Sequence, residues 1–427
     1  MKRAFLLLLL LAAPAFAQSL DQRVQRELPS LLETYRTLHA HPELSTQESQ
    51  TSALLAKRLR DLGYDVTERF GRYKESGTCY GVVAVMKNGS GPTLLIRTDM
   101  DALPVTEQTG LAYASENAGV MHACGHDVHM TTLLGTAKLL ADLKSQWHGT
   151  VMLIGQPAEE IVRGANGMLE GGLYEQFGRP DFAIALHDWA TLESGKVGYR
   201  PGPIMAATDS INLTIRGVGG HGAAPQNTKD PVVLAAETIV ALQTIASRER
   251  SPLDPVVVTV GKIEGGTKRN IIPDDVRLYL TVRTFSPAVR ERVLASIQRI
   301  PKGLAMAAGV PDDRAPLYEH LDGESVDATF NDATLTERFV KAAGRELGAD
   351  NVVKIDPAMV SEDFGRFGLD GKIPSALFVV GAADPAKLAD GSQAGLHSAR
   401  FAPYIPEKVI ATGIRAAVSG ALELLAR

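Results

Sequence analysis

Short, almost continuous apolar runs alternate with helical segments along most of the chain. One helical pattern extends from Leu28 to about Leu62 with an interruption near Pro42, and another covers residues 130–143. Strands that are apolar throughout are typical of a sheet that helices cover on both faces. The pattern therefore predicts an α/β fold with a central, mostly parallel, twisted sheet. Its strands are expected at residues 80–86, 93–97, 150–156, 182–186 and 375–381.

The middle of the chain has a different pattern. Residues 277–282 alternate polar and apolar side chains, which indicates a sheet with one solvated face. The elements follow the order strand, helix, strand, strand, helix, strand, which is the ferredoxin-like order. We therefore expect a small α+β domain at residues 204–318, inserted between the two parts of a larger domain at 18–203 and 319–427. The six elements are expected at residues 209–217, 230–249, 255–265, 275–285, 287–300 and 315–323.

Composition adds two limits to this picture. The length of 427 residues suits two domains, and a hydrophobic content of 45% is that of a globular protein. The formal charge of −5 argues against nucleic-acid binding, because a phosphate-binding surface normally leaves a basic excess.

The N-terminal residues 1–17 have the pattern of a secretory signal peptide. Lys2 and Arg3 precede an apolar run at 5–13, and Ala15 and Ala17 form an A-x-A cleavage site. The run is shorter than the ~20 residues of a membrane-spanning helix. We expect cleavage near Ala17 and a secreted or periplasmic protein without a stable membrane anchor.

Acidic side chains and histidines follow four of the expected strands. The carboxyl ends of parallel strands meet at one edge of a sheet, where the ligands of open α/β folds collect. Each of these residues alone has an ordinary structural explanation. Together they offer the imidazole and carboxylate groups that a divalent cation such as zinc prefers, so we expect a metal site at this edge. The residues are Asp99, Asp101, Glu159, Glu160, His187, Asp188 and His397.

The stretch MHACGHDVHM, residues 121–130, contains three of the ten histidines and one of the two cysteines. Three roles compete for Cys124. A disulfide would require Cys79, and a nucleophile would need one base and an oxyanion hole rather than a cluster of histidines. Metal ligation explains the cluster best of the three. Asp127 is suited to cap the helix that begins there.

Eight motifs of this chain resemble those of the di-metal amidohydrolases of the aminoacylase and carboxypeptidase superfamily. The likeness is greatest to the branch of hippurate hydrolases, N-acyl-amino-acid amidohydrolases and auxin-conjugate hydrolases, and it spans nearly the whole chain after residue 17. The family fold, a di-metal α/β domain with an inserted lid or dimerisation domain, agrees with the expected segmentation. The motifs are RTDMDALPV (97–105), MHACGHDVHM (121–130), GQPAEE (155–160), ALHDWA (185–190), HGAAPQNTKDPV (221–232), GGTKRNIIPD (265–274), VSEDFGRF (360–367) and GLHSARF (395–401).

The resemblance implies a set of ligands for two divalent ions, either zinc or manganese, cobalt or nickel. By similarity, Cys124 bridges the ions, Glu160 and His397 bind one of them, and His126 and His187 bind the other. The same resemblance makes Glu159 the general base and Asp101 a group that orients a ligand. The wider superfamily has a histidine at the position of Asp99 and an aspartate as the bridge.

The inserted domain contributes further residues by resemblance. His221 would donate to the scissile carbonyl oxygen, reaching across a homodimer, and Asn270 and Arg283 match positions that hold the free carboxylate of the substrate. Arg283 also has the simpler interpretation of a charge on a solvated strand face. Trp189 and its neighbour Ala190 stand where relatives often have other residues before a proline.

These residues together predict a metallo-amidohydrolase. The expected reaction is hydrolysis of the amide bond of an N-acyl amino acid or short peptide with a free α-carboxylate, which releases the amino acid. A periplasmic carboxypeptidase or dipeptidase of the same fold is an alternative, and a non-catalytic protein that binds metal or peptide is another. The sequence indicates no role for Glu362, Asp363, His122, His129 and Cys79.

Overall fold

The computed structural model describes residues 18–74 and 77–426. The signal peptide predicted for residues 1–17 lies outside these ranges. Among the helices of the described ranges, none combines the length and the apolar character needed to cross a bilayer.

A sheet of eight strands forms the centre of the larger domain, in the order β1-β2-β4-β3-β5-β16-β6-β15. The four strands β4, β3, β5 and β16 run parallel to one another, and β2 pairs antiparallel with β4. This topology confirms the predicted α/β class. The strands are β1 (Asp65–Phe70), β2 (Gly81–Asn88), β3 (Thr93–Asp99), β4 (Gly149–Gln156), β5 (Phe182–Glu193), β6 (Val197–Tyr199), β15 (Val352–Lys354) and β16 (Ser375–Ala383).

Helices cover both faces of this sheet, as the apolar strands predict. In β3, Leu94 and Ile96 pack into one hydrophobic cluster and Leu95 packs into another, because successive side chains of a strand point to opposite faces. The first face is covered by α1 (Leu20–Ala40), α2 (Ser49–Asp61), α3 (His126–Asp142), α8 (Ala333–Leu347) and α10 (Pro406–Leu424). The second is covered by α4 (Gly164–Glu170), α5 (Leu173–Phe177) and the 3-10 helix η6 (Phe364–Gly368).

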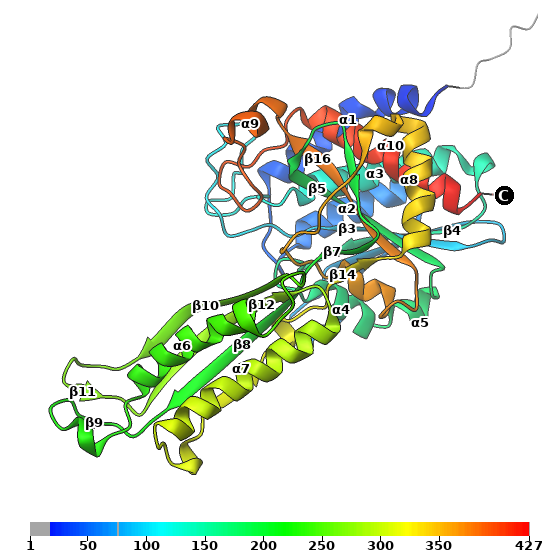
Figure 1. Ribbon diagram of the computed structural model, residues 1–427. Helices are drawn as coiled ribbons and strands as arrows, with labels where there is room; N and C mark the ends of the chain where they lie inside the picture. The colour runs from blue at the N-terminus through cyan, green and yellow to red at the C-terminus, as the bar shows by residue number, and fades with distance from the viewer. Residues whose placement is uncertain (1–17, 75–76, 427) are drawn as a thin grey trace, which may run out of the picture.

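The inserted domain extends away from the larger domain as an arm (Figure 1). It has one antiparallel sheet in the order β10-β12-β8-β13, and α6 and α7 pack on one face of it. Along β12, Leu278, Leu280 and Val282 are buried on that face, whereas Arg277 points the other way, so the predicted alternation is confirmed. The elements are β8 (Ala207–Arg216), α6 (Pro231–Arg248), β10 (Val256–Gly265), β12 (Asp275–Thr284), α7 (Pro287–Ala307) and β13 (Leu317–His320), in the predicted order.

Two small sheets mark the ends of this arm. At its far tip β9 (Gly220–His221) pairs with β11 (Ile271–Ile272) (Figure 1). At its base β7 (Gly202–Met205) pairs with β14 (Thr329–Asn331). The domain limits at 204 and 318 stay predictions. The remaining short helices are α9 (Pro385–Asp390), η1 (Lys144–Gln146), η2 (Pro225–Asn227), η3 (Asp312–Arg314), η4 (Asp322–Glu324) and η5 (Ala349–Asn351).

Candidate metal centre

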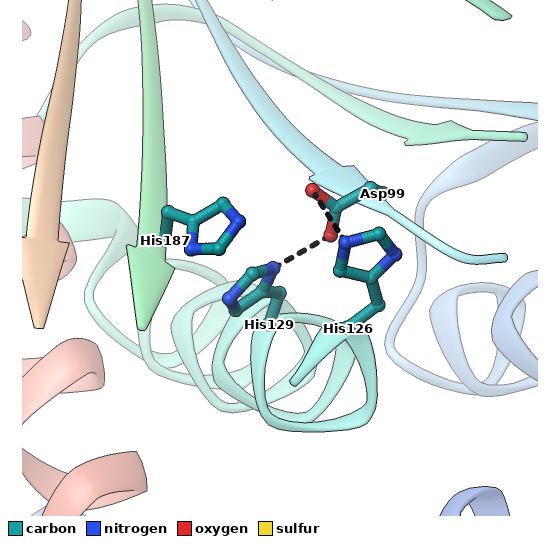
Figure 2. A group of neighbouring side chains, drawn as sticks. All are labelled: Asp99, His126, His129 and His187. Atoms are coloured by element: carbon teal, nitrogen blue, oxygen red, sulfur yellow. Dashed lines mark hydrogen bonds and ion pairs between the residues drawn. The ribbon is translucent and has the colours of Figure 1, made fainter. Parts of the chain in front are cut away.

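Polar side chains gather at the carboxyl ends of the parallel strands. Asp99 ends β3, and Glu159 and Glu160 follow β4 after two residues. His187 lies within β5 rather than after it, because β5 is longer than its apolar run. Figure 2 shows Asp99, His129 and His187 pointing toward one another together with His126, from β3, α3 and β5.

The first turn of α3 differs from the sequence expectation. Asp127 does not cap this helix: α3 already begins at His126, and its N-cap is Gly125 with φ of 79°. A cap must lie outside the helix, and Asp127 lies within its first turn. Its carboxylate instead accepts a hydrogen bond from His39 Nδ1 at 2.7 Å.

Gly125 is required by two features of this turn. Its φ lies in the left-handed region, which favours glycine, and a Cβ at this position would lie 2.3 Å from Oδ2 of Asp188. Glycine therefore lets the start of α3 approach β5, which brings Cys124 and His126 toward His187.

Two buried histidines turn one ring nitrogen toward the cluster. His126 Nδ1 donates to the carbonyl oxygen of Asp101 at 2.7 Å, and His187 Nδ1 donates to the carbonyl oxygen of Asp188 at 2.7 Å. Each bond occupies Nδ1 and leaves Nε2 facing the cluster, which is the usual arrangement of a metal-binding histidine.

The donor atoms face one another at distances that suit shared cations. Cys124 Sγ lies 3.6 Å from His187 Nε2, and His126 Nε2 lies 3.8 Å from Glu160 Oε1. Two donors around one tetrahedral zinc are about 3.4 Å apart, because each bond is about 2.1 Å long. Among the described residues, His126 Nε2 and Glu160 Oε1 are buried without a hydrogen-bond partner, which is costly unless a cation binds them.

His397 completes the set from a distant part of the chain. Its Nε2 lies 3.4 Å from Oε2 of Glu160, and its backbone N–H donates to the carbonyl oxygen of Ala123 at 2.7 Å. Burial, with nearby His126 and His187, lowers the pKa of His397, so its ring is neutral at pH 7 and able to bind a metal. All five predicted ligands thus lie in one cluster, and their division between two ions stays a prediction.

His129 and Asp99 are committed to the protein itself. His129 Nδ1 lies 2.6 Å from Asp99 Oδ1, and His129 Nε2 accepts the backbone N–H of Asp188 at 2.8 Å. The other oxygen of Asp99 accepts from Arg97 at 2.7 Å. Asp99 and His129 therefore stabilise the position of the cluster through their hydrogen bonds to the protein. His122 is also buried, and burial lowers its pKa to about 4.

The environment of Cys124 bears on the three roles considered for it. Cys79 and Cys124 are both free. Burial, followed by the charges of Glu160 and Glu159, raises the pKa of the Cys124 thiol well above its ordinary value. A nucleophilic cysteine needs a lowered pKa. Bound cations would supply the positive charge that a thiolate requires here, so the surroundings favour metal ligation.

The backbone of the turn that carries Glu159 and Glu160 donates hydrogen bonds to the carboxyl groups of Asp101 and Glu48. Asp101 Oδ1 accepts the backbone N–H of Glu159, and its Oδ2 accepts the backbone N–H of Glu160, both at 3.0 Å. Glu48 accepts the backbone N–H of Ala158 at 2.9 Å, and Ala158 has φ of 51°. Asp101 is therefore placed to position both glutamates, in keeping with the orienting role that the resemblance implies.

Arg97 connects the cluster to the SEDF segment. It is buried in β3 and donates to Glu362 Oε1 at 2.8 Å, to Gln156 at 2.8 Å and to Asp99. Glu362 and Asp363, which have no role in the sequence analysis, are thus partners of Arg97. Arg97 was not among the expected site residues. A charge at the end of an apolar strand could have indicated its role, because a buried charge is almost always paired.

A cavity of about 830 Å³ opens beside the cluster. Its wall includes Trp189 and Ile161, and Arg283 reaches it from β12 of the inserted domain. Arg283 Nη1 donates to Ser361 Oγ at 2.6 Å. The cavity also includes the metal-binding candidates Cys124, Glu160, His187 and His397, with Glu159.

Two predicted residues lie elsewhere. His221 is in β9 and Asn270 directly precedes β11, so both are exposed at the far tip of the arm (Figure 1). Within one chain, the structure therefore brings Arg283 to the cavity but not His221 or Asn270.

The chain is similar to several known proteins. Residues 95–421 match the family described as Peptidase family M20/M25/M40. The chain is 35% identical to an N-acetyldiaminopimelate deacetylase of Limosilactobacillus reuteri, over 92% of this chain and 97% of that protein. It is 41% identical to an N-acetyl-L-cysteine deacetylase of Bacillus subtilis, over 79% of each chain.

A solved structure shares the whole architecture. It is a Bacillus subtilis protein described as a dinuclear metal binding peptidase from the M20 family. It superposes on this chain with a TM-score of 0.77 and 30% sequence identity, covering 93% of this chain and 99% of that one.

Proposed function

Because the chain belongs to peptidase family M20/M25/M40 and is a metal-dependent amide hydrolase, we propose that it acts on N-acyl amino acids with a free α-carboxylate. The reaction would hydrolyse the amide bond and release the amino acid. One observation carries this proposal: a single cavity is lined by four of the five metal-binding candidates, by Glu159 and by Arg283. A short peptide offers the same amide and carboxylate, so carboxypeptidase or dipeptidase activity is the alternative.

We infer that two divalent cations, zinc or manganese, cobalt or nickel, are the cofactor. Cys124, His126, Glu160, His187 and His397 would hold them, and the unpartnered Nε2 of His126 and Oε1 of Glu160 support this assignment. When bound, such cations polarise a carbonyl group and lower the pKa of a water molecule toward ~7.

Glu159 is the general base in this proposal. Burial and the neighbouring charges of Glu362 and Glu160 raise the pKa of its carboxyl group above the ordinary value, which makes its carboxylate a stronger base. It would take a proton from water and later deliver that proton to the departing amine. Asp101 would position Glu159 through the backbone of the turn.

Arg283 would recognise the α-carboxylate of the substrate. A guanidinium has five N–H donors in a planar fork and binds a carboxylate through two parallel hydrogen bonds. Arg283 is about half-buried and lies in the same cavity as the metal-binding candidates, so a substrate carboxylate could reach it while the amide lies beside Glu159.

We also propose a homodimer in which His221 and Asn270 complete the cavity of the partner subunit. Their exposure at the tip of the arm, away from their own cavity, supports this proposal. His221 would donate to the developing oxyanion, and Asn270 would help to hold the carboxylate.

A mixing experiment tests the shared site. The variants His221→Ala and Glu159→Gln are each expected to be inactive alone. After complete subunit exchange, about half of the dimers are mixed, and each mixed dimer has one of its two cavities with both native residues. About a quarter of wild-type activity is therefore expected. Activity that stays at the level of the separate variants would contradict the shared site.

We propose export of the mature protein, with cleavage near Ala17. Expression in a bacterial host, cell fractionation and N-terminal sequencing would test this. A product in the cytoplasm that retains its first residues would contradict it.

The decisive test of function is a substrate screen with metal analysis of the same sample. The purified, metal-loaded protein is incubated with hippurate, N-acetyl amino acids and dipeptides, and released amino acid is measured by mass spectrometry. Hydrolysis of N-acyl amino acids supports the proposal, and hydrolysis of peptides alone favours the carboxypeptidase or dipeptidase. A metal-loaded protein that releases nothing would favour a non-catalytic binder.

Metal removal tests the cofactor. Dialysis against a chelator should abolish hydrolysis, and zinc, manganese or cobalt should restore it. Activity that survives complete metal removal would favour a thiol mechanism at Cys124.

A further inference from the structure

Residues 358–363 lie against both connections between the larger domain and the arm. On the outgoing side, Ala358 N–H donates to Ile204 O at 2.9 Å, and Ala206 N–H donates to Val360 O at 2.8 Å. On the returning side, Thr329 Oγ1 donates to the carbonyl oxygen of Glu362 at 3.2 Å. The segment is thus hydrogen-bonded to both connections between the larger domain and the arm.

The end of this segment is anchored in the core of the larger domain. Glu362 Oε1 accepts from Arg97 at 2.8 Å and from the backbone N–H of Phe364 at 2.9 Å. Asp363 accepts from Gln156 at 2.6 Å and from the backbone N–H of Ala165 at 3.0 Å. Both carboxylates are buried. Breaking such paired, buried charges is costly, so the backbone at 362–363 has a well-defined position.

Ser361 directly precedes this anchor and faces the cavity beside the metal-binding candidates. Its hydroxyl oxygen accepts a hydrogen bond of 2.6 Å from Arg283 Nη1. Ser361 belongs to the larger domain and Arg283 to the arm, so the bond joins the two across the cavity. A serine on a fixed backbone thereby restrains a long side chain that would otherwise have many rotamers.

We propose that Ser361 is a positioning residue that holds Arg283 toward the α-carboxylate of the substrate and so makes the enzyme select acids over neutral amides. This inference rests on the proposed function. One of the five N–H groups of the guanidinium donates to Ser361, and the others remain able to donate to a carboxylate. Glu324 lines the same cavity, so a released Arg283 would have a competing carboxylate within the site.

The test compares two substrates, an N-acyl amino acid and its α-carboxamide. Ser361→Ala should raise KM for the acid roughly tenfold with little change in kcat, because a hydrogen bond to a charged group is lost from binding. The kinetics on the carboxamide should stay near those of the wild type. Ser361→Thr keeps the hydroxyl and should restore the preference for the acid. Ser247→Ala, an exposed serine on α6, is the matched control.

A double-mutant cycle connects the effect to Arg283. Arg283→Ala should abolish most of the preference for the acid, and adding Ser361→Ala should cause no further loss. Equal losses on both substrates in Ser361→Ala, or losses that add to those of Arg283→Ala, would overturn the inference. A wild-type protein that hydrolyses no N-acyl amino acid would overturn the proposed function itself. Wild-type turnover with unchanged selectivity in Ser361→Ala would overturn only the role of Ser361.

Discussion

The carboxylate of Asp101 is hydrogen-bonded to the backbone of Glu160: Oδ2 of Asp101 accepts the Glu160 N–H at 3.0 Å. Its other oxygen accepts the N–H of Glu159, and its own carbonyl oxygen accepts from Nδ1 of His126 at 2.7 Å. One residue thus connects two metal-binding candidates with the proposed base. Its effect on chemistry is indirect, through the positions of its neighbours.

Replacing Asp101 with asparagine should weaken metal binding or turnover by roughly 10–100-fold, as is usual for residues that orient metal ligands. The asparagine NH₂ would face a backbone N–H, so one donor loses its acceptor. Steady-state kinetics and metal analysis measure this. Ser45→Ala is the control, because it removes only the hydroxyl that donates to Asp101 and leaves the carboxylate in place. A variant with wild-type metal content and turnover would contradict this role.

The two adjacent glutamates should respond differently to the same substitution. Glu159→Gln should retain the bound metal and lose activity by ~10²–10⁴-fold, because an amide cannot accept the proton. Glu160→Gln should lose metal, because it removes a carboxylate that faces both His126 and His397. Metal analysis and kinetics separate the two effects. Near-normal turnover in Glu159→Gln would rule out its role as the base.

The approach of α3 to β5 depends on Gly125. Gly125→Ala should destabilise the protein and reduce metal affinity, because the new Cβ would meet the carboxylate of Asp188. Gly119→Ala is a matched control: its φ is 78°, but a Cβ there would meet nothing within 4 Å. The control should cost about 1–2 kcal/mol from backbone strain alone, and Gly125→Ala should cost clearly more. Denaturant unfolding measures both, and equal costs would contradict the close contact.

His39 should make stability depend on pH. Burial opposes its charge, but the hydrogen bonds and charges of Asp127 and Glu107 outweigh burial and raise the pKa of His39 from 6.5 to about 9. The stabilisation is fully present below pH 6.5 and is lost as the pH rises through about 9. Its full size is on the order of 3 kcal/mol.

Unfolding of the wild type and of His39→Gln at several pH values tests this. The difference in free energy of unfolding between them should shrink between pH 6.5 and 9. His41→Gln, at an exposed position, is the control. A difference that stays constant over this range would show that His39 is not charged in the folded protein.

Much of this molecule follows from local sequence patterns. Apolar runs define β2, β3, β4, β5 and β16 because a strand buried on both faces needs apolar side chains throughout. The alternation along β12 and the order of its neighbours define the sheet of the arm. Glu160 and His187 could be expected near one another because the carboxyl ends of parallel strands share one edge. Local patterns therefore predict the architecture and the edge of the sheet at which the ligand candidates meet.

Which distant groups meet depends on how the whole chain packs. Arg97 binds Glu362, which is 265 positions away, and His39 binds Asp127, which is 88 positions away; no local periodicity encodes such pairs. The start of α3 likewise depends on the close approach of Gly125 to Asp188, so Asp127 faces His39 instead of capping the helix. The same packing brings Arg283 to the cavity and leaves His221 at the tip of the arm. Patterns along a chain reflect local geometry and burial, whereas the partners of a charged side chain depend on how the whole chain packs.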